Sequence, residues 1–272
     1  MAPAMTAAAP LSQSERAWRD LREGLAAVHI WGMLGWQEIR LRYRRSTLGP
    51  LWLTAGMGVL VLGMGPLYGK LLGQNLTVYL PFLTVGLISW TMIAALMNDS
   101  CNAFTHAESM IKQVKLPLSL HALRVVWKNL IMFAHNFLVL VVVLAFVPQN
   151  WGWNVVLLPL SLFLLAFNAW WVGIFLGMAG ARFRDITPIV GSVVQILFFV
   201  TPVLWPIEQL GRHSWAGLIN PFYHFVEIVR APLLGREIAS LSWLVVIVVT
   251  VGGWLLTFLI FSRVRTRIAY WV

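Results

Sequence analysis

The sequence is short of charge, and of acidic residues in particular. Only 11% of the 272 residues are charged and ten are Asp or Glu, whereas soluble domains carry about 25% charged residues. Hydrophobic residues make up 59% of the chain. This composition is typical of a protein that lies in hydrocarbon, and the apolar segments leave no length for a separate soluble domain.

The sequence also lacks the motifs of several enzyme classes. A single cysteine, Cys101, excludes an intrachain disulfide and a cysteine-based metal cluster. There is no GxxxxGK[ST] nucleotide-binding loop, no HExxH, CxxC or GxSxG motif and no Asp-rich motif for binding diphosphate through Mg²⁺, and the six histidines show no ligand spacing. We therefore expect no catalytic, metal or cofactor site in this chain, no nucleic-acid partner and no energy source of its own.

Six segments approach the ~20-residue length of a membrane-spanning helix. They cover about residues 51–72, 78–97, 118–147, 155–180, 189–204 and 241–262. The fifth is short and contains Pro202, and the sixth has no charge. The predicted fold class is an all-α integral membrane protein with six transmembrane helices, formed by residues 46–272.

The net charge of +10 is distributed unevenly over the connections. Fifteen Lys and Arg residues lie on the side of the termini and four on the other, with Lys128 at a span edge left out. Because cytoplasmic loops of membrane proteins are enriched in Lys and Arg, both termini are predicted to be cytoplasmic. Asp99 is the one acid in the apolar cores, a candidate functional group because charge in the bilayer costs ~3 kcal/mol or more. Its place near the interface favours the simpler interpretation that it is hydrated or paired.

The N-terminal segment reads as a disordered lead, 1–13, followed by an amphipathic helix, 14–45. Trp18, Leu21, Leu25 and Val28 form an apolar stripe, which predicts a helix in the membrane interface or, alternatively, one packed on a soluble partner. Glu38 and Arg42 are spaced for an i,i+4 pair. Four arginines lie at the C-terminal end of this predicted helix. They are expected to keep the start of the first span on the cytoplasmic side, and the attraction of each to anionic lipid is worth ~1 kcal/mol. They are Arg40, Arg42, Arg44 and Arg45.

Two connections are unusual. Residues 106–114 form a short polar helix between the second and third spans, either a handle for a cytoplasmic partner or a mere turn. Residues 205–235 are apolar and broken by three prolines, which predicts re-entrant half-helices rather than an ordinary loop with an amphipathic helix. Within it, Glu227 and Arg230 share a helix face, where they pair with each other or one of them contacts sugar.

Aromatic residues are frequent, with fifteen tryptophans. Several fall inside the predicted spans, where they face lipid or pack the bundle. The alternative is that they line a passage for a glycan, because the C–H faces of sugar rings stack on aromatic rings. The predicted aromatic lining comprises Trp90, Trp170, Trp171, Phe198, Phe199 and Trp254.

Five blocks of the sequence together resemble a known family. In chain order they are RYRRSTLGPLWLT (42–54), LPFLTVGLISW (80–90), AESMIKQVKLPLSLHALRVVWKN (107–129), FRDI (183–186) and NPFYHFVEIVRAPLLG (220–235). They resemble the permease subunits of type-2 ABC exporters for polysaccharides, over nearly all of the chain beyond about residue 30. The central and C-terminal blocks are most similar to the lipopolysaccharide O-antigen branch, with the capsule and teichoic-acid branches as near relatives.

The resemblance implies a transporter subunit rather than an enzyme. Such permeases are homodimers in the bacterial inner membrane, with two copies of a separate cytoplasmic ATPase that binds ATP and Mg²⁺. Their cargo is a polysaccharide on a polyprenyl diphosphate lipid. The alternatives are a type-2 permease for a drug or another small lipid, and a glycolipid enzyme, which would need a cluster of acids at one membrane face.

The resemblance also implies residue roles. The coupling helix to the ATPase would be Glu108, Ser109, Met110, Ile111, Lys112 and Gln113. The arginines at 40–45 would recruit the lipid diphosphate, besides their topological role, because arginine forms charge-assisted bonds to phosphate. The periplasmic re-entrant gate would contain Asn220, Pro221, Phe222, Tyr223, Glu227 and Arg230.

Overall fold

The computed structural model describes residues 12–47, 49 and 51–272, and within these every regular element is a helix. Most of the predicted lead, 1–13, lies outside the described residues. The elements run α1 (Gln13–Ala26), α2 (Val28–Arg42), α3 (Leu51–Leu71), α4 (Leu76–Cys101), η1 (Thr105–Ala107), α5 (Glu108–Gln113), α6 (Ser119–Phe146), η2 (Trp153–Leu157), α7 (Leu158–Arg182), α8 (Ile186–Val200), η3 (Ile207–His213), α9 (Ser214–Leu218), α10 (Pro221–Leu233), α11 (Ser240–Val264), η4 (Arg265–Arg267) and α12 (Ile268–Trp271).

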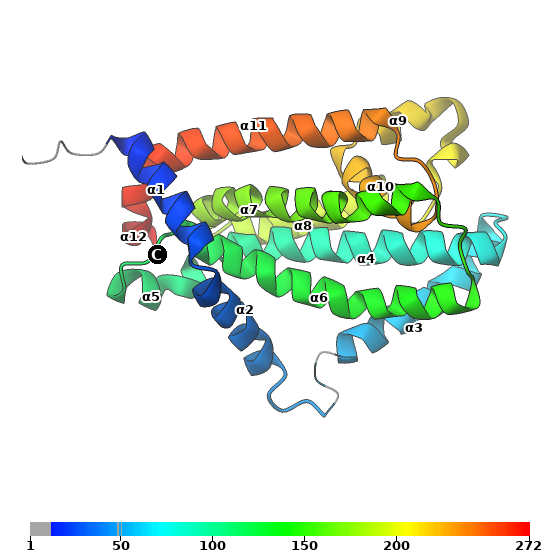
Figure 1. Cartoon of the computed structure of the whole chain (residues 1–272), viewed down its shortest axis with the longest axis horizontal. Coiled ribbons are helices and arrows are strands. Elements are labelled where there is room, and N and C mark those ends of the chain that lie inside the picture. The colour runs from blue at the N-terminus through cyan, green and yellow to red at the C-terminus, as the bar shows by residue number, and fades with distance from the viewer. Residues whose placement is uncertain (1–11, 48, 50) are drawn as a thin grey trace, which may run out of the picture.

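The long helices form one elongated bundle (Figure 1). Five helical stretches of the described chain are long and apolar enough to cross a membrane: α3, α4, α6, Trp153–Arg182 and Ser240–Trp271. They correspond to five of the six predicted spans. The remaining one corresponds to α8, an apolar helix of 15 residues, shorter than the ~20 that a straight crossing needs.

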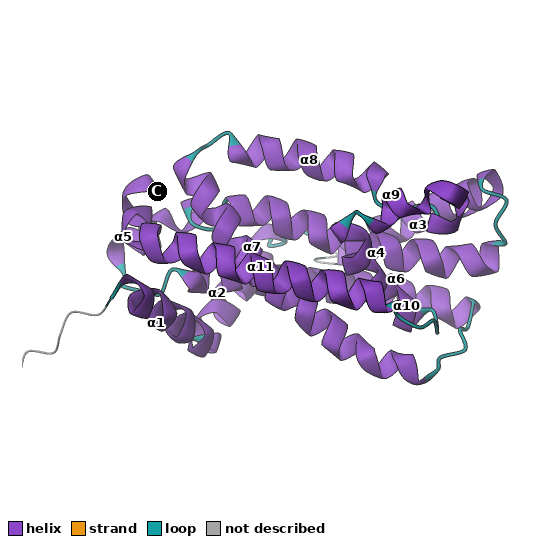
Figure 2. Cartoon of the chain, turned by 90° about the horizontal axis from the view of Figure 1, so that it is seen from above, coloured by secondary structure: helices purple, strands orange, loops and turns teal. Residues whose placement is uncertain are grey.

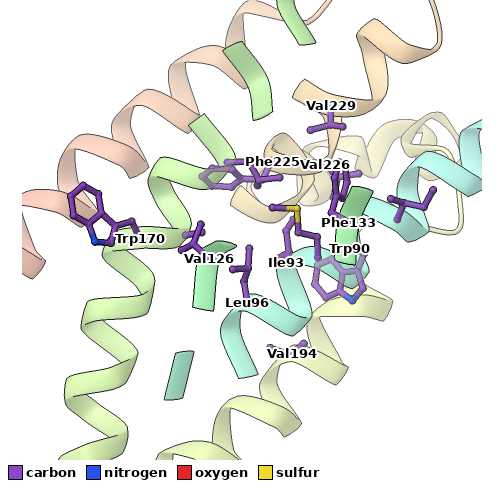
Figure 3. Packing of buried hydrophobic residues seen from close by; sticks show 14 of the residues in the cluster. Trp90, Ile93, Leu96, Val126, Phe133, Trp170, Val194, Phe225, Val226 and Val229 are labelled. Carbon is purple, nitrogen blue, oxygen red and sulfur yellow. The ribbon is translucent and has the colours of Figure 1, made fainter. Parts of the chain in front are cut away.

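Helix α4 is the centre of the bundle, because α3, α6, α7, α8 and α10 all contact it. Of its most apolar stretch 72% is buried, against 17% for α3. Its core side chains Trp90, Ile93 and Leu96 meet residues of α6, α7 and α10 (Figure 3). Helix α3 lies at the lower side of the bundle in Figure 1, and α8 lies at the upper edge in Figure 2. Both expose apolar side chains such as Val59 and Ile196, as helices facing lipid or a second chain do.

The N-terminal segment differs from the single helix predicted over 14–45. The chain forms two helices that meet at Ala27, because α1 packs across α6 and α11 whereas α2 follows α6. Of the predicted stripe, only Leu21 is buried, and Trp18, Leu25 and Val28 are exposed. Three of the four stripe residues are thus exposed in the single chain, which both the membrane-interface and the partner-packing interpretation allow.

Both termini of the described chain lie at one end of the bundle, with α1, α5 and α12 (left in Figure 1). We call this the terminal end, and the opposite end, with η3 and α9, the distal end. The residues of the predicted 106–114 helix form η1 and α5 at the terminal end. The residues of the predicted re-entrant segment, 205–235, form η3, α9 and α10.

Candidate functional site

Helix α5 projects from the terminal end with no buried residue. The Lys112 ammonium donates to the Glu108 carboxylate at 2.6 Å, and this hydrogen bond together with the lysine charge lowers the pKa of Glu108. Ile111 packs against the core. The outward surface of α5 is therefore short, exposed and charged.

The position of α5 is fixed from behind by large buried side chains. Phe104, just before η1, is fully buried, and a Cβ at Gly177 of α7 would press against its ring. The C-terminal helix α12 contacts both α5 and α7, and the Arg182 guanidinium lies 5.5 Å from the centre of the Trp271 ring. Packed contacts therefore connect the region of α5 with α7 and the C-terminal helix α12.

Near the segment that leads into α5, four charged side chains form ion pairs that connect α2, α4 and α6. The Arg124 Nε lies 3.0 Å from Glu38 Oε1, and the Lys128 Nζ lies 3.5 Å from Glu38 Oε2 and 2.8 Å from Asp99 Oδ2. We call Glu38, Asp99, Arg124 and Lys128 the charge cluster. Arg124 also donates to the carbonyl of Ala103 at 3.4 Å, so the cluster contacts the segment that leads into α5.

The charge cluster settles two sequence predictions. Asp99 is paired, with Lys128 and with the Asn129 amide at 2.9 Å, so the simpler interpretation of this acid is confirmed. Glu38 is turned toward Arg124 and Lys128, and Arg42 is not among its ion-pair partners, so the predicted i,i+4 pair was wrong. The reason is burial: two cations one turn apart on α6 need acids, and Glu38 is within their reach. Their four-residue spacing at the start of a span was the signal that the sequence offered.

Asp20 is a second site that the sequence reasoning missed. Its side chain is buried and accepts hydrogen bonds from the backbone N–H groups of Leu118 and Ser119 at 3.0 and 2.9 Å, and from Arg265 at 2.7 Å. It thus caps the N-terminus of α6 from another helix and ties α1 to the end of α11. A Cβ at Gly24 would meet the Ser119 hydroxyl, so this close approach depends on glycine.

The four arginines predicted to recruit lipid diphosphate lie at the end of α2 and just beyond it. All four are exposed, and the structure gives them no ion pair among the described residues. The connection continues through Pro50, which lies outside the described residues. Their role in recruitment stays a prediction.

The aromatic residues predicted to line a passage fall into two groups. Trp90 packs against Phe198 and Phe222, with Phe199 next to Phe198 and exposed. In the other group, Trp170 and Trp254 meet at 4.9 Å between ring centres. Trp171 donates to Asn168 and lines a cavity of about 270 Å³ between α4, α7 and α10.

Trp90 and Trp170 are 5% and 7% exposed and belong to the packed core (Figure 3). For these two residues the structure of the single chain favours the packing interpretation that the sequence left open.

The distal half of the bundle is organised by a buried arginine. Arg230 is 1% exposed and donates to the carbonyls of Pro202 and Val203 at 2.9 and 3.1 Å. Its guanidinium lies 4.0 Å from the centre of the Phe82 ring, in the space left because Gly86 has no side chain. We call this arrangement the Arg230 clamp.

The clamp includes the predicted pair. Glu227 Oε2 lies 3.7 Å from Arg230, so the pairing interpretation is confirmed, and Arg236 reaches Glu227 at 3.3 Å. Asn220 accepts from the N–H of Phe222 at the start of α10 and donates to Thr201. Together these contacts fix the turn after α8 against α4 and α10.

Comparison with known proteins identifies the family of this chain. The family model described as ABC-2 type transporter matches residues 30–234, more than half of the chain. The chain belongs to this family. This ABC-2 permease is therefore a multi-pass membrane transport subunit, and the matched range contains α5, the charge cluster and the Arg230 clamp.

Three curated relatives carry the same printed name, O-antigen export system permease protein RfbA. The one from Myxococcus xanthus is 28% identical over 199 residues, which are 72% of this chain and 76% of the relative. Two from Klebsiella pneumoniae are 24% and 22% identical over 246 residues, 86% of this chain and 91% of each relative. The similarity to these relatives extends over most of the ABC-2 permease.

Proposed function

We propose that this chain is the transmembrane subunit of an ATP-driven exporter that moves polyprenyl-diphosphate-linked O-antigen polysaccharide across the bacterial inner membrane. The proposed substrate is supported by the similarity to O-antigen export permeases over 86% of the chain. In this proposal the terminal end faces the cytoplasm, and α8 is the fifth of the six spans in chain order. The segment from η3 to α10 is re-entrant from the periplasmic side.

A second copy of the chain completes the passage in this proposal. The apolar, exposed faces of α3 and α8 support that arrangement, because a conduit for a long glycan needs walls that a single packed bundle does not supply. Phe199 on α8 then faces the passage. The arginines at 40, 42, 44 and 45 meet the diphosphate at the cytoplasmic leaflet.

Energy enters through α5 in this proposal. Two copies of a cytoplasmic ATPase subunit seat α5 in a groove, and their ATP-driven closure displaces it. The charge cluster and the packing behind α5 pass the displacement to α2, α4 and α7.

The test uses the α5 pair. The exchange variant, Glu108→Lys with Lys112→Glu, keeps an ion pair within the helix but reverses the charge that a partner protein contacts at each position. The matched control, with alanine at both positions, removes both charges. We expect the wild type to co-purify with a nucleotide-binding subunit, and the exchanged variant to lose that subunit or lose coupled export. Purification of the wild type without any ATPase would overturn the proposal.

The substrate is tested separately by deleting the gene for this chain and examining surface glycans. We expect loss of surface O-antigen and accumulation of the lipid-linked polymer inside the cell. Loss of capsule or teichoic acid with normal O-antigen would assign the permease to one of those substrates instead. Arg44→Lys with Arg45→Lys keeps the positive charge for orientation but removes bidentate phosphate binding, so unchanged export would contradict the recruitment role.

A further inference from the structure

An apolar groove lies beneath α1, on the outer face of the bundle. Its volume is about 520 Å³, within the ~300–1,000 Å³ range of ligand pockets. It is lined by Trp18, Leu21, Arg22 and Leu25 of α1, Phe167 and Trp170 of α7, and Trp254, Leu255 and Phe258 of α11. Because α1 and α11 lie outside the residues 30–234 that match the family model, the groove is built mainly by parts of this chain beyond that match.

Arg22 is the one charged residue in this lining. It follows Trp18 by four residues and precedes Leu25 by three, so it lies on the same side of α1 as these two exposed apolar side chains. Its neighbour Arg19 is paired with Glu23 at 3.3 Å, whereas the structure gives Arg22 no ion pair among the described residues. An arginine beside an apolar groove offers charge complementarity to the headgroup of an anionic lipid whose chain occupies the groove.

The surroundings match an amphiphile. The groove extends from the interface helix toward the middle of α7, where Phe167 and Trp170 lie, so its long wall is apolar. Along α11, Ser262 follows Phe258 by one helical turn and begins a smaller cavity of about 150 Å³. That cavity is lined by Gln13, Arg16, Ser262, Arg265 and Thr266. Apolar lining thus gives way to polar and basic lining along α11, the order of chain and headgroup in an amphiphile.

We propose that this groove is a binding site for an anionic glycerophospholipid of the membrane leaflet at the terminal end. An acyl chain lies between α7 and α11 beneath α1, and the phosphate accepts hydrogen bonds from Arg22. The groove is on the α11 side of the bundle, away from α2 and α3 (top and bottom of Figure 1). A resident phospholipid here therefore does not compete with cargo at the arginines of the α2–α3 connection.

A lipid bound at this site contacts the exposed side of α1. Helix α1 contacts the bundle through α6 and α11, and a lipid chain fills the space between Trp18 and Leu25 on one side and Trp254 on the other. The presence of anionic lipid then holds α1, and with it Asp20, in place.

The test is lipid retention by the full-length chain purified in mild detergent and equilibrated with mixed micelles of phosphatidylglycerol and phosphatidylethanolamine. Retained lipid is counted by mass spectrometry for wild type, Arg22→Gln and the matched control Arg19→Gln. Losing one basic contact should reduce the preference for phosphatidylglycerol about 5-fold in Arg22→Gln. The control should keep it. Both side chains are exposed, so the fold is not expected to depend on either.

A second variant, Leu255→Trp, narrows the groove without changing charge and should reduce retention of both lipids. Equal losses in Arg19→Gln and Arg22→Gln would overturn the site in favour of diffuse charge attraction. If Arg22→Gln kept the full preference for phosphatidylglycerol, the assignment of the lipid phosphate to Arg22 would be overturned. Retention of a prenyl diphosphate lipid in place of phospholipid would overturn the identity of the occupant. None of these results depends on which polysaccharide is exported.

Discussion

The two ends of the bundle bury positive charge in different ways. At the terminal end, Arg124 and Lys128 are shared between two acids on two other helices. At the distal half, Arg230 is bound mainly by two backbone carbonyls and an aromatic ring. The charge cluster is redundant, since Glu38 has two cations and Lys128 has two acids. The clamp depends on one side chain, because carbonyls of a turn find no other donor when it is removed.

This difference suits different tasks. Ion pairs between helices can exchange partners when the helices shift, so the charge cluster suits an end that moves with α5 in the proposed mechanism. Two hydrogen bonds from one planar guanidinium fix a turn in a single geometry, so the clamp suits a segment that has to stay in place. The predictions below test the contrast from its strongest point to its weakest.

Arg230→Ala should have the largest effect. It leaves the carbonyls of Pro202 and Val203 buried without donors and removes a partner of Glu227, which should cost about 3–5 kcal/mol of unfolding free energy. The measurement is unfolding in mixed micelles with increasing SDS. Arg230→Lys is the matched control: it keeps the charge but cannot span both carbonyls, so it should fall between wild type and alanine. A loss below about 1 kcal/mol in the alanine variant would mean that the clamp is not what holds the turn.

Lys128→Met should cost less, about 2 kcal/mol, because Asp99 keeps the Asn129 amide and Glu38 keeps Arg124. Asp99→Asn alone leaves Lys128 with Glu38. In the double variant Lys128→Met with Asp99→Asn the two losses should fall short of additivity by about 1 kcal/mol, measured in the same titration. Strict additivity would show that the cluster is not a coupled unit.

Asp20→Ala tests a mixed case, since this carboxylate binds backbone N–H groups as well as Arg265. We expect a loss of about 1–2 kcal/mol, the usual range for removing a helix cap in a favourable buried geometry. Asp20→Asn keeps an acceptor for the N-terminus of α6 and loses the ion pair with Arg265, so it separates the two contributions. Hydrogen exchange at the first amides of α6 is the readout. Unchanged protection of these amides in Asp20→Ala would contradict the capping role.

Much of this architecture could be predicted from the sequence, because span length and apolar composition act locally. The positions of the long helices, the short helix at 108–113 and the Glu227–Arg230 pair belong to that class. What was missed depends on contacts between distant segments: Asp20 meets Leu118 and Arg265, and Glu38 meets Arg124. Periodicity places a residue on a face of its helix, but it does not say which helix lies opposite. For the same reason the break at Ala27 was not predicted, since it follows from two packing directions rather than from a breaker residue.

The smallest effect is expected where the same chemistry is exposed. At the start of α1, the Ser12 hydroxyl accepts from the Glu15 N–H at 3.2 Å and the Glu15 carboxylate accepts from the Ser12 N–H at 2.7 Å. Ser12→Ala should cost about 0.5–1 kcal/mol of local helix stability, seen as faster hydrogen exchange in the first turn of α1 only.

The backbone hydrogen bond from Ser12 lowers the pKa of Glu15 from its usual 4.5, so the folded carboxyl binds its proton less readily than the unfolded one. The contribution of Glu15 is therefore present above pH 4.5 and is lost as the pH falls through the lower, folded pKa. The protection of the first-turn amides, measured relative to the intrinsic exchange rate at each pH, should therefore fall over that acidic range in the wild type and much less in Glu15→Gln. If Ser12→Ala cost as much as Asp20→Ala, burial would not be what distinguishes these two caps, because the same kind of contact between a side-chain oxygen and backbone N–H groups would then be worth as much in water as inside the bundle.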